Sequence, residues 1–131
     1  MNTNSKEAIL AAARQTAQAH GYSGLNFREL ADEVGIKAAS IYHYFPSKAD
    51  LGAAVARRYW EDTMGDLDAL LAETSNPISA LREYPQIFRR SLESANRLCL
   101  CSFMSAEYDD LPEPVKKEVQ AFCRCERRLA E

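Results

Sequence analysis

The chain has 131 residues, 47% of them apolar and 27% charged, which is typical of one soluble globular domain or two very small ones and excludes extensive disorder. Its apolar runs are far shorter than the roughly 18 residues that a membrane-spanning helix needs, so we expect no membrane partner. The net charge is −3, but residues 1 to 60 carry seven basic and five acidic side chains while the later residues are acidic, which indicates two modules with different partners.

The first segment, MNTNSKEAIL, lacks a basic region followed by a hydrophobic stretch, so we expect a cytoplasmic protein. Strand signals are nearly absent and Ala, Leu, Glu and Arg dominate, which predicts an all-α fold. In the first predicted helix, Asn4 and Glu7 have the spacing of a capping box, and an apolar stripe runs from Ile9 to His20. Gly21 is expected to end this helix.

Two short helices follow, joined by a glycine. Asn26 begins a second capping box and predicts a helix over 27–34, while Gly35 supplies the left-handed backbone of a sharp turn before a helix over about 38–44. Such a pair is either a helical hairpin or a helix-turn-helix. Ala31, four residues before Gly35, allows a close and steep crossing, which favours the helix-turn-helix. The small core between the helices is predicted to be Leu30, Val34, Ile36, Ile41 and Tyr44.

The helix over 38–44 has a further set of side chains outside this core. Small residues at its start, Ala38, Ala39 and Ser40, allow close entry into the DNA major groove, where an alanine methyl group can contact the thymine methyl. Side chains that can donate hydrogen bonds to phosphate oxygens flank them, namely Lys37, Tyr42, His43 and Lys48. Tyr44 and Phe45 are expected to point inward. The pattern therefore predicts a surface that reads double-stranded DNA.

The remaining elements are helical as well. Ser47 and Asp50 form a third capping box before a long amphipathic helix that reaches about Glu73. Asn76 and Pro77 begin the next helix, which meets Pro85, a residue expected to kink it, and continues to about Ala95. A short helix is predicted over 99–108, and a last one runs from the proline-rich segment 111–114 to the final residue, Glu131.

The segment from residue 5 to about 75 resembles the TetR family of bacterial transcriptional regulators. The resemblance is carried by the strings NFRELA (26–31), VGI (34–36) and SIYHYFPSKADL (40–51). It implies a helix-turn-helix DNA-binding head over residues 1–48, a helical effector-binding and dimerisation body over residues 49–131, and a homodimer on a palindromic operator. The residues that match positions usually touching DNA are Arg28, Lys37, Tyr42, His43 and Lys48.

Family members run considerably further than this chain, and their last two helices usually build the dimer interface. We therefore expect the body to be incomplete at its C-terminus. Aromatic and methionine side chains of the later helices are candidates for lining an effector pocket, although residues of these types at helical spacing also build ordinary cores. The candidates are Tyr59, Trp60, Met64, Phe88, Phe103, Met104, Tyr108 and Phe122.

Four cysteines form two Cys-x-Cys pairs: Cys99, Cys101, Cys123 and Cys125. Residues two apart on a helix point to nearly opposite sides, so the members of one pair do not easily share a metal ion, and we expect no metal and no cofactor. Burial as small apolar residues is the favoured interpretation, and a thiol-based redox sensor is the alternative.

The leading hypothesis is a ligand-responsive DNA-binding transcriptional regulator, a repressor that a small molecule releases from its operator. One rival is a protein-interaction module with little DNA affinity, and another is the thiol sensor. We do not expect an enzyme, because His43 has no serine, cysteine or acid placed to activate it.

Overall fold

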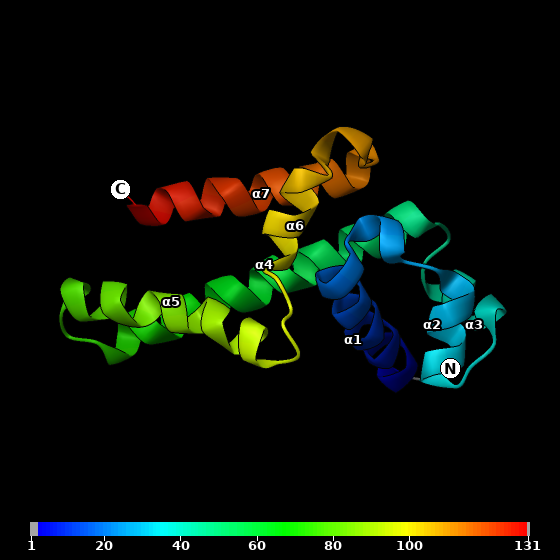
Figure 1. The fold of residues 1–131 in the computed structure, drawn as a ribbon, viewed down its shortest axis with the longest axis horizontal. Helices are drawn as coiled ribbons and strands as arrows, with labels where there is room; N and C mark the ends of the chain where they lie inside the picture. Colours follow the sequence, from blue (N-terminus) through cyan, green and yellow to red (C-terminus); the bar gives the residue numbers. More distant parts are fainter. Residues whose placement is uncertain (1–2, 131) are drawn as a thin grey trace.

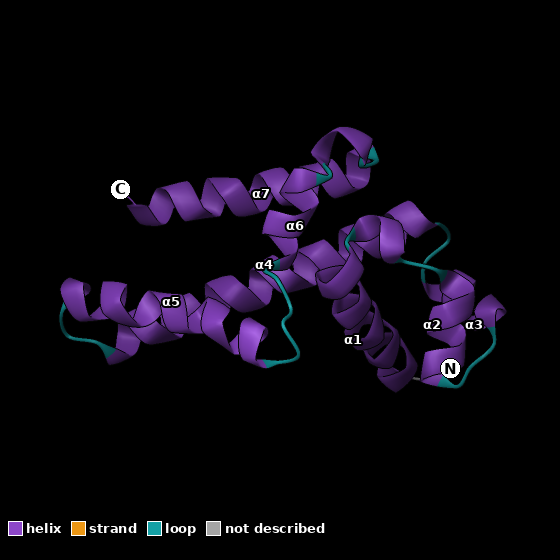
Figure 2. Cartoon of the chain, viewed as in Figure 1, coloured by secondary structure: helices purple, strands orange, loops and turns teal. Residues whose placement is uncertain are grey.

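The computed structural model describes the backbone of residues 3–130 and the side chains of residues 4–125. Within these limits the chain consists of helices joined by loops and contains no strand (Figure 2), which confirms the predicted all-α class. No helix of this described part is long and apolar enough to cross a membrane. The elements in chain order are α1 (Thr3–His20), η1 (Tyr22–Gly24), α2 (Phe27–Val34), α3 (Ala38–Tyr44), α4 (Lys48–Glu73), α5 (Pro77–Glu93), α6 (Leu100–Ala106), η2 (Tyr108–Asp110) and α7 (Glu113–Ala130).

The long helix α4 organises the molecule. Helices α1, α5, α6 and α7 all pack against it, and α2 and α3 pack against α1 and each other. Figure 1 shows α2 and α3 at one end of the molecule and α5 beside the C-terminal half of α4 at the other end. The core between these helices is apolar, and Leu51 and Val55 of α4 lie at its centre with almost no exposure. Burying such side chains is the main source of helix stability in a protein of this size.

The predicted caps and glycine turn of the head are present in the structure. The Asn26 side-chain oxygen accepts hydrogen bonds from the amides of Arg28 and Glu29, at 2.9 and 3.1 Å, and so begins α2. Gly35 ends α2 with a φ of 80°, a left-handed conformation that glycine adopts without steric cost. The Ser47 hydroxyl accepts from the amide of Asp50 at 3.1 Å and begins α4.

Three local expectations were wrong. Asn4 lies inside α1, which begins at Thr3, and so does not occupy the predicted N-cap position. As predicted, α5 continues through Pro85, but it ends at Glu93 and not near Ala95, which adopts a left-handed φ of 59°. The short helix is α6, which begins one residue later than predicted and stops at Ala106, with a separate 3-10 turn after it. A helix ends where its backbone groups no longer find hydrogen-bond partners within the helix. The spacing of side chains in the sequence predicts such ends only approximately.

Glu7 pairs with α4 instead of capping α1. The Arg58 Nη1 and Nη2 atoms lie 2.6 and 3.0 Å from the two carboxylate oxygens of Glu7, and this hydrogen-bonded guanidinium lowers the pKa of the Glu7 carboxyl. A lowered carboxyl pKa adds stability that is present above the pKa of the unfolded chain and is lost as the pH falls through the lower folded-state pKa. Because the pair is exposed, the effect is small.

We therefore expect Glu7→Gln to lower the denaturation midpoint slightly at about pH 7 and to lower it less at about pH 3, because the ion pair is lost as the wild-type carboxyl takes up a proton. Urea titrations of both proteins at the two pH values measure this difference. Glu83→Gln, an exposed substitution on α5, is the control and should show no such pH dependence. An equal deficit of Glu7→Gln at both pH values would show that the ion pair contributes nothing.

Candidate DNA-binding surface

Helix α3 presents its outer face to solvent. Ala39, Tyr42 and His43 are exposed, with 54% of the surface of Tyr42 accessible, and Ala38 and Ser40 are half-buried. The opposite face is anchored by Ile41, which is fully buried. Small and hydrogen-bonding side chains thus share an accessible helix face whose position is fixed by core packing.

The core beneath this face is made by α1, α2 and α3. Leu30 and Ile41 are fully buried, as predicted, whereas Val34, Ile36 and Tyr44 are only half-buried at its edge. Phe45, which follows α3, is buried as expected. The two helices therefore form a rigid unit in which α3 is held from behind.

The rings of the stretch Ile41–Phe45 have separate partners. The Tyr42 ring lies with its centroid 4.5 Å from that of Phe27, at an interplanar angle of 52°, so its position is set by the start of α2. The exposed His43 ring meets Tyr44 edge-on at 5.2 Å. Ring contacts at these distances restrict side-chain motion. Tyr42 is therefore both accessible and held in place.

A concave surface adjoins α3. An open groove of about 550 Å³ is lined by side chains from the starts of α2 and α4 and from α3, namely Leu25, Asn26, Phe27, Arg28, Ala38, Tyr42 and Lys48. Four of these residues are among those predicted to contact DNA. The exposed cation of Arg28 and the Lys48 ammonium group on its lining suit a polyanion better than a neutral ligand.

Lys48 is less free than the sequence suggested. Its Nζ atom lies 4.7 Å from the centroid of the Tyr22 ring and 3.5 Å from the carbonyl oxygen of Ser23, and the side chain is half-buried. This contact ties the start of α4 to η1 and orients the ammonium group. Sequence reasoning missed Tyr22 and Ser23, because they lie 25 residues or more from Lys48 and match no motif. Lys37, by contrast, is exposed at the N-cap position of α3, where its backbone is extended.

The candidate pocket residues fall into two groups. Tyr59, Met104 and Phe122 are buried in the main core, where burial, together with a hydrogen bond to Cys99, raises the pKa of the Tyr59 phenol. The other five are half-buried: Trp60, Met64, Phe88, Phe103 and Tyr108.

The half-buried residues are not all in one place. The Trp60 indole donates a hydrogen bond to Glu118 at 2.8 Å and so links α4 to α7, whereas Phe88 stacks edge-on with Tyr84 on α5, at 5.3 Å between ring centroids. Ordinary core packing accounts for the buried group. An effector pocket between the later helices stays a prediction.

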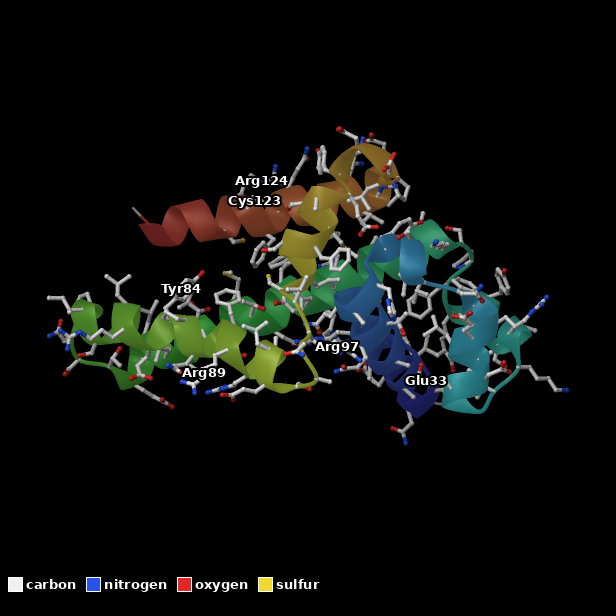
Figure 3. All side chains as sticks on the ribbon, viewed as in Figure 1. Glu33, Tyr84, Arg89, Arg97, Cys123 and Arg124 are labelled. Atoms are coloured by element: carbon white, nitrogen blue, oxygen red, sulfur yellow. The ribbon has the colours of Figure 1, made fainter. Side chains whose placement is uncertain are left out.

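The cysteines do not share one environment. Cys101 is buried in the core, which suits a small apolar side chain, and Cys99, Cys123 and Cys125 are half-buried. Figure 3 shows Cys123 on α7, in the body, whereas Glu33 in the same view marks α2 of the head. Among the described residues, no cluster of three or more His, Cys, Asp or Glu side chains is arranged to hold a metal ion.

The chain is similar in sequence to known bacterial regulatory proteins. Residues 9–55 match the family model of bacterial regulatory proteins, tetR family. The chain is 32% identical over 96 residues to the HTH-type transcriptional regulator RutR of Escherichia coli K12, a match that covers 71% of this chain and 45% of RutR. It is 27% identical over 124 residues to the HTH-type transcriptional repressor NemR of the same organism, covering 92% of this chain and 62% of NemR.

A solved structure extends the likeness to the body. The crystal structure of a TetR-family transcriptional regulator from Agrobacterium tumefaciens superposes with a TM-score of 0.88 and 31% identity, over 93% of this chain and 65% of that protein. The chain thus spans about half the length of RutR and two thirds of the Agrobacterium protein. Because the superposition includes nearly all of this chain, the likeness is not confined to the helix-turn-helix.

Proposed function

Because the chain belongs to the TetR family of bacterial transcriptional regulators, we propose that it is a DNA-binding transcriptional repressor that a small-molecule effector releases from its operator. The observation that carries the proposal is the accessible outer face of α3, where Ala39, Tyr42 and His43 are exposed beside a groove lined by cations. The curated relatives RutR and NemR are named as a transcriptional regulator and a transcriptional repressor, which supports the same function and not an enzymatic one.

In this proposal α3 enters the major groove. Ala38, Ala39 and Ser40 are short enough to let the helix backbone approach the base edges, and alanine methyl groups suit thymine. Arg28, at the start of α2, and Lys37, at the N-cap of α3, are both exposed and bind phosphate oxygens, with Tyr42 and His43 as further donors. Lys48 contributes from the start of α4, held over the Tyr22 ring.

The proposed unit of function is a cytoplasmic homodimer. Residues 1–48 form the DNA-binding head and residues 49–131 the effector-binding body. Two heads related by a two-fold axis match operator half-sites roughly 34 Å apart or a multiple of this distance. An effector in the body would tilt α4 and change that spacing, and so lower affinity without touching DNA.

The direct test is selection of bound duplexes from a random pool, followed by gel shifts with the enriched duplex. We expect Tyr42→Ala to weaken binding by roughly 10- to 150-fold, which corresponds to losing one hydrogen bond to a charged group. Tyr42→Phe keeps the ring against Phe27 and removes only the hydroxyl. If that hydroxyl donates to a phosphate, Tyr42→Phe should bind the duplex almost as weakly as Tyr42→Ala. No enrichment, or unchanged migration of the Tyr42→Ala complex, would reject the proposal.

A second candidate is a protein-interaction module without DNA affinity. Helix α5 favours it, because Ile78, Leu81 and Leu92 are all more than half exposed although they are large apolar side chains. Sedimentation of the chain with and without the enriched duplex separates the two candidates. A repressor sediments faster with DNA, whereas an interaction module ignores the duplex and self-associates or stays monomeric.

A further inference from the structure

The Glu107 carboxylate, in the body, binds the turn η1, which connects α1 to α2 in the head. Glu107 follows α6, and its Oε1 and Oε2 atoms accept hydrogen bonds from the backbone amides of Tyr22 and Ser23, at 2.8 and 3.1 Å. These amides open the 3-10 turn η1, which has no side-chain cap of its own. Amides at the start of a helical turn lack partners within it, so a carboxylate bound to two of them makes a strong charge-assisted contact.

The backbone next to this contact leaves no space for a side chain. Gly21 has a φ of 75°, which side chains disfavour, and a Cβ atom there would lie 2.4 Å from Glu107 Oε1 and 2.5 Å from a ring carbon of Phe103. The connector between α1 and α2 is therefore pressed directly against the end of α6. Head and body meet here through a defined contact.

The same connector reaches the candidate DNA-binding surface. The Tyr22 ring lies against the backbone of α4 at Gly52, where an added Cβ would approach it to 2.6 Å, and the Lys48 ammonium lies over the ring. One residue beyond η1, Leu25 is buried in the core and precedes Asn26, the cap of α2. The position of η1 thus affects both the start of α2 and the orientation of Lys48.

We propose that Glu107 is a positioning residue for DNA binding: by clasping Tyr22 and Ser23 it sets the angle of the reading head relative to the body. This inference rests on the proposed DNA-binding function. In the chain, Glu107 lies between Phe103 and Tyr108, two of the half-buried candidate pocket residues, so movement of α6 on effector binding would reach the head through this clasp. Glu107 itself does not contact DNA.

The test is the affinity of Glu107→Gln for the duplex enriched by the wild-type chain. The glutamine keeps the shape of the side chain but can accept from only one of the two amides. We expect binding to a duplex with two half-sites to weaken by about tenfold, within the usual range for coupling between sites. Binding to a duplex with a single half-site should change much less, because the angle between the heads no longer matters there.

Charge provides an internal control. Removing a negative charge from the protein strengthens its attraction to DNA, so electrostatics alone predicts the opposite sign. Glu83→Gln makes the same charge change on exposed α5 and should bind slightly more tightly or equally. Glu107→Asp keeps the charge but is too short to reach both amides, and it should weaken binding as well.

Hydrogen exchange tests the clasp itself. In Glu107→Gln the amides of Tyr22 and Ser23 should lose protection, while the amide of Leu30, which is bonded to Asn26 within the head, keeps it. Equal two-half-site binding by wild type and Glu107→Gln would overturn the inference and leave the proposed function intact. Global loss of helical structure in Glu107→Gln would also overturn the inference, because Glu107 would then stabilise the whole fold and not only the position of the head. Failure of the wild-type chain to bind any duplex would reject the proposed function, and the inference with it.

Discussion

The double substitution Arg28→Ala/Lys37→Ala is expected to weaken binding to the enriched duplex on the order of 10- to 100-fold at low salt. Both side chains are exposed on the head, one at the start of α2 and one at the N-cap of α3, and neither forms an ion pair with a residue whose side chain the structure describes. If each binds a phosphate, its removal leaves fewer counterions to be released on binding. The plot of log K against log salt should therefore flatten by about two per head, and by twice that for a dimer.

A matched control separates contact from net charge. Arg82→Ala/Arg90→Ala also removes two exposed basic side chains, but from α5, which lies at the end of the molecule opposite to the head (Figure 1). The control lowers long-range attraction to DNA by a similar amount and should leave the salt slope nearly unchanged. If the two double variants had equal slopes, Arg28 and Lys37 would act only through the overall charge, and the proposed docking of α3 would be wrong.

Leu30→Ala is expected to give the largest loss of stability, about 2–5 kcal/mol. Leu30 is 1% exposed and lies in the core that joins α2 to α1 and α3, so the shorter side chain leaves a cavity that the short helices cannot fill by a small shift. A single domain is stable by only about 5–15 kcal/mol in total, so this loss is a large part of the whole. Urea denaturation followed by circular dichroism measures it.

The control for this truncation is Leu81→Ala on α5. Leu81 is 71% exposed, so losing the same atoms removes almost no buried surface and should change the free energy of unfolding by less than about 0.5 kcal/mol. A loss at Leu81 as large as at Leu30 would mean that α5 is covered in solution, for instance by a second copy of the chain. A small loss at Leu30 would mean that the head is not the packed unit described above.

Local signals predicted the head well. The bounds of α2 and α3 agree with the predicted ranges because their ends are decided by neighbours in sequence: Asn26 caps its own helix, Gly35 is required by backbone sterics, and Ser47 bonds to an amide three residues away. The side of α3 that would face DNA followed from the same spacing, since Ile41 had to be buried. Tyr42 and His43, the next two residues of α3, are accessible for that reason.

Long-range contacts were not predictable in this way. The motif predicted Lys48 as a phosphate contact, but nothing in it predicted the position of the ammonium group over the Tyr22 ring. Glu107 had no motif around it, and its partners lie 84 and 85 residues away. Glu7 fitted a capping box but bonds to Arg58, 51 residues later. In each case several local geometries have similar energies, and the contact with a distant element decides among them.

The sequence by itself therefore determined the helical class, the helix-turn-helix and the residues that its outer face displays, because caps, glycine turns and apolar periodicity act over three or four positions. Only the tertiary structure decided how the head is held against the body, which of the aromatic residues are core, and that Glu107 binds the connector. Those outcomes depend on how α1, α4, α6 and α7 pack together, and the free energy of such packing is shared among residues too far apart in the chain for any local pattern to record.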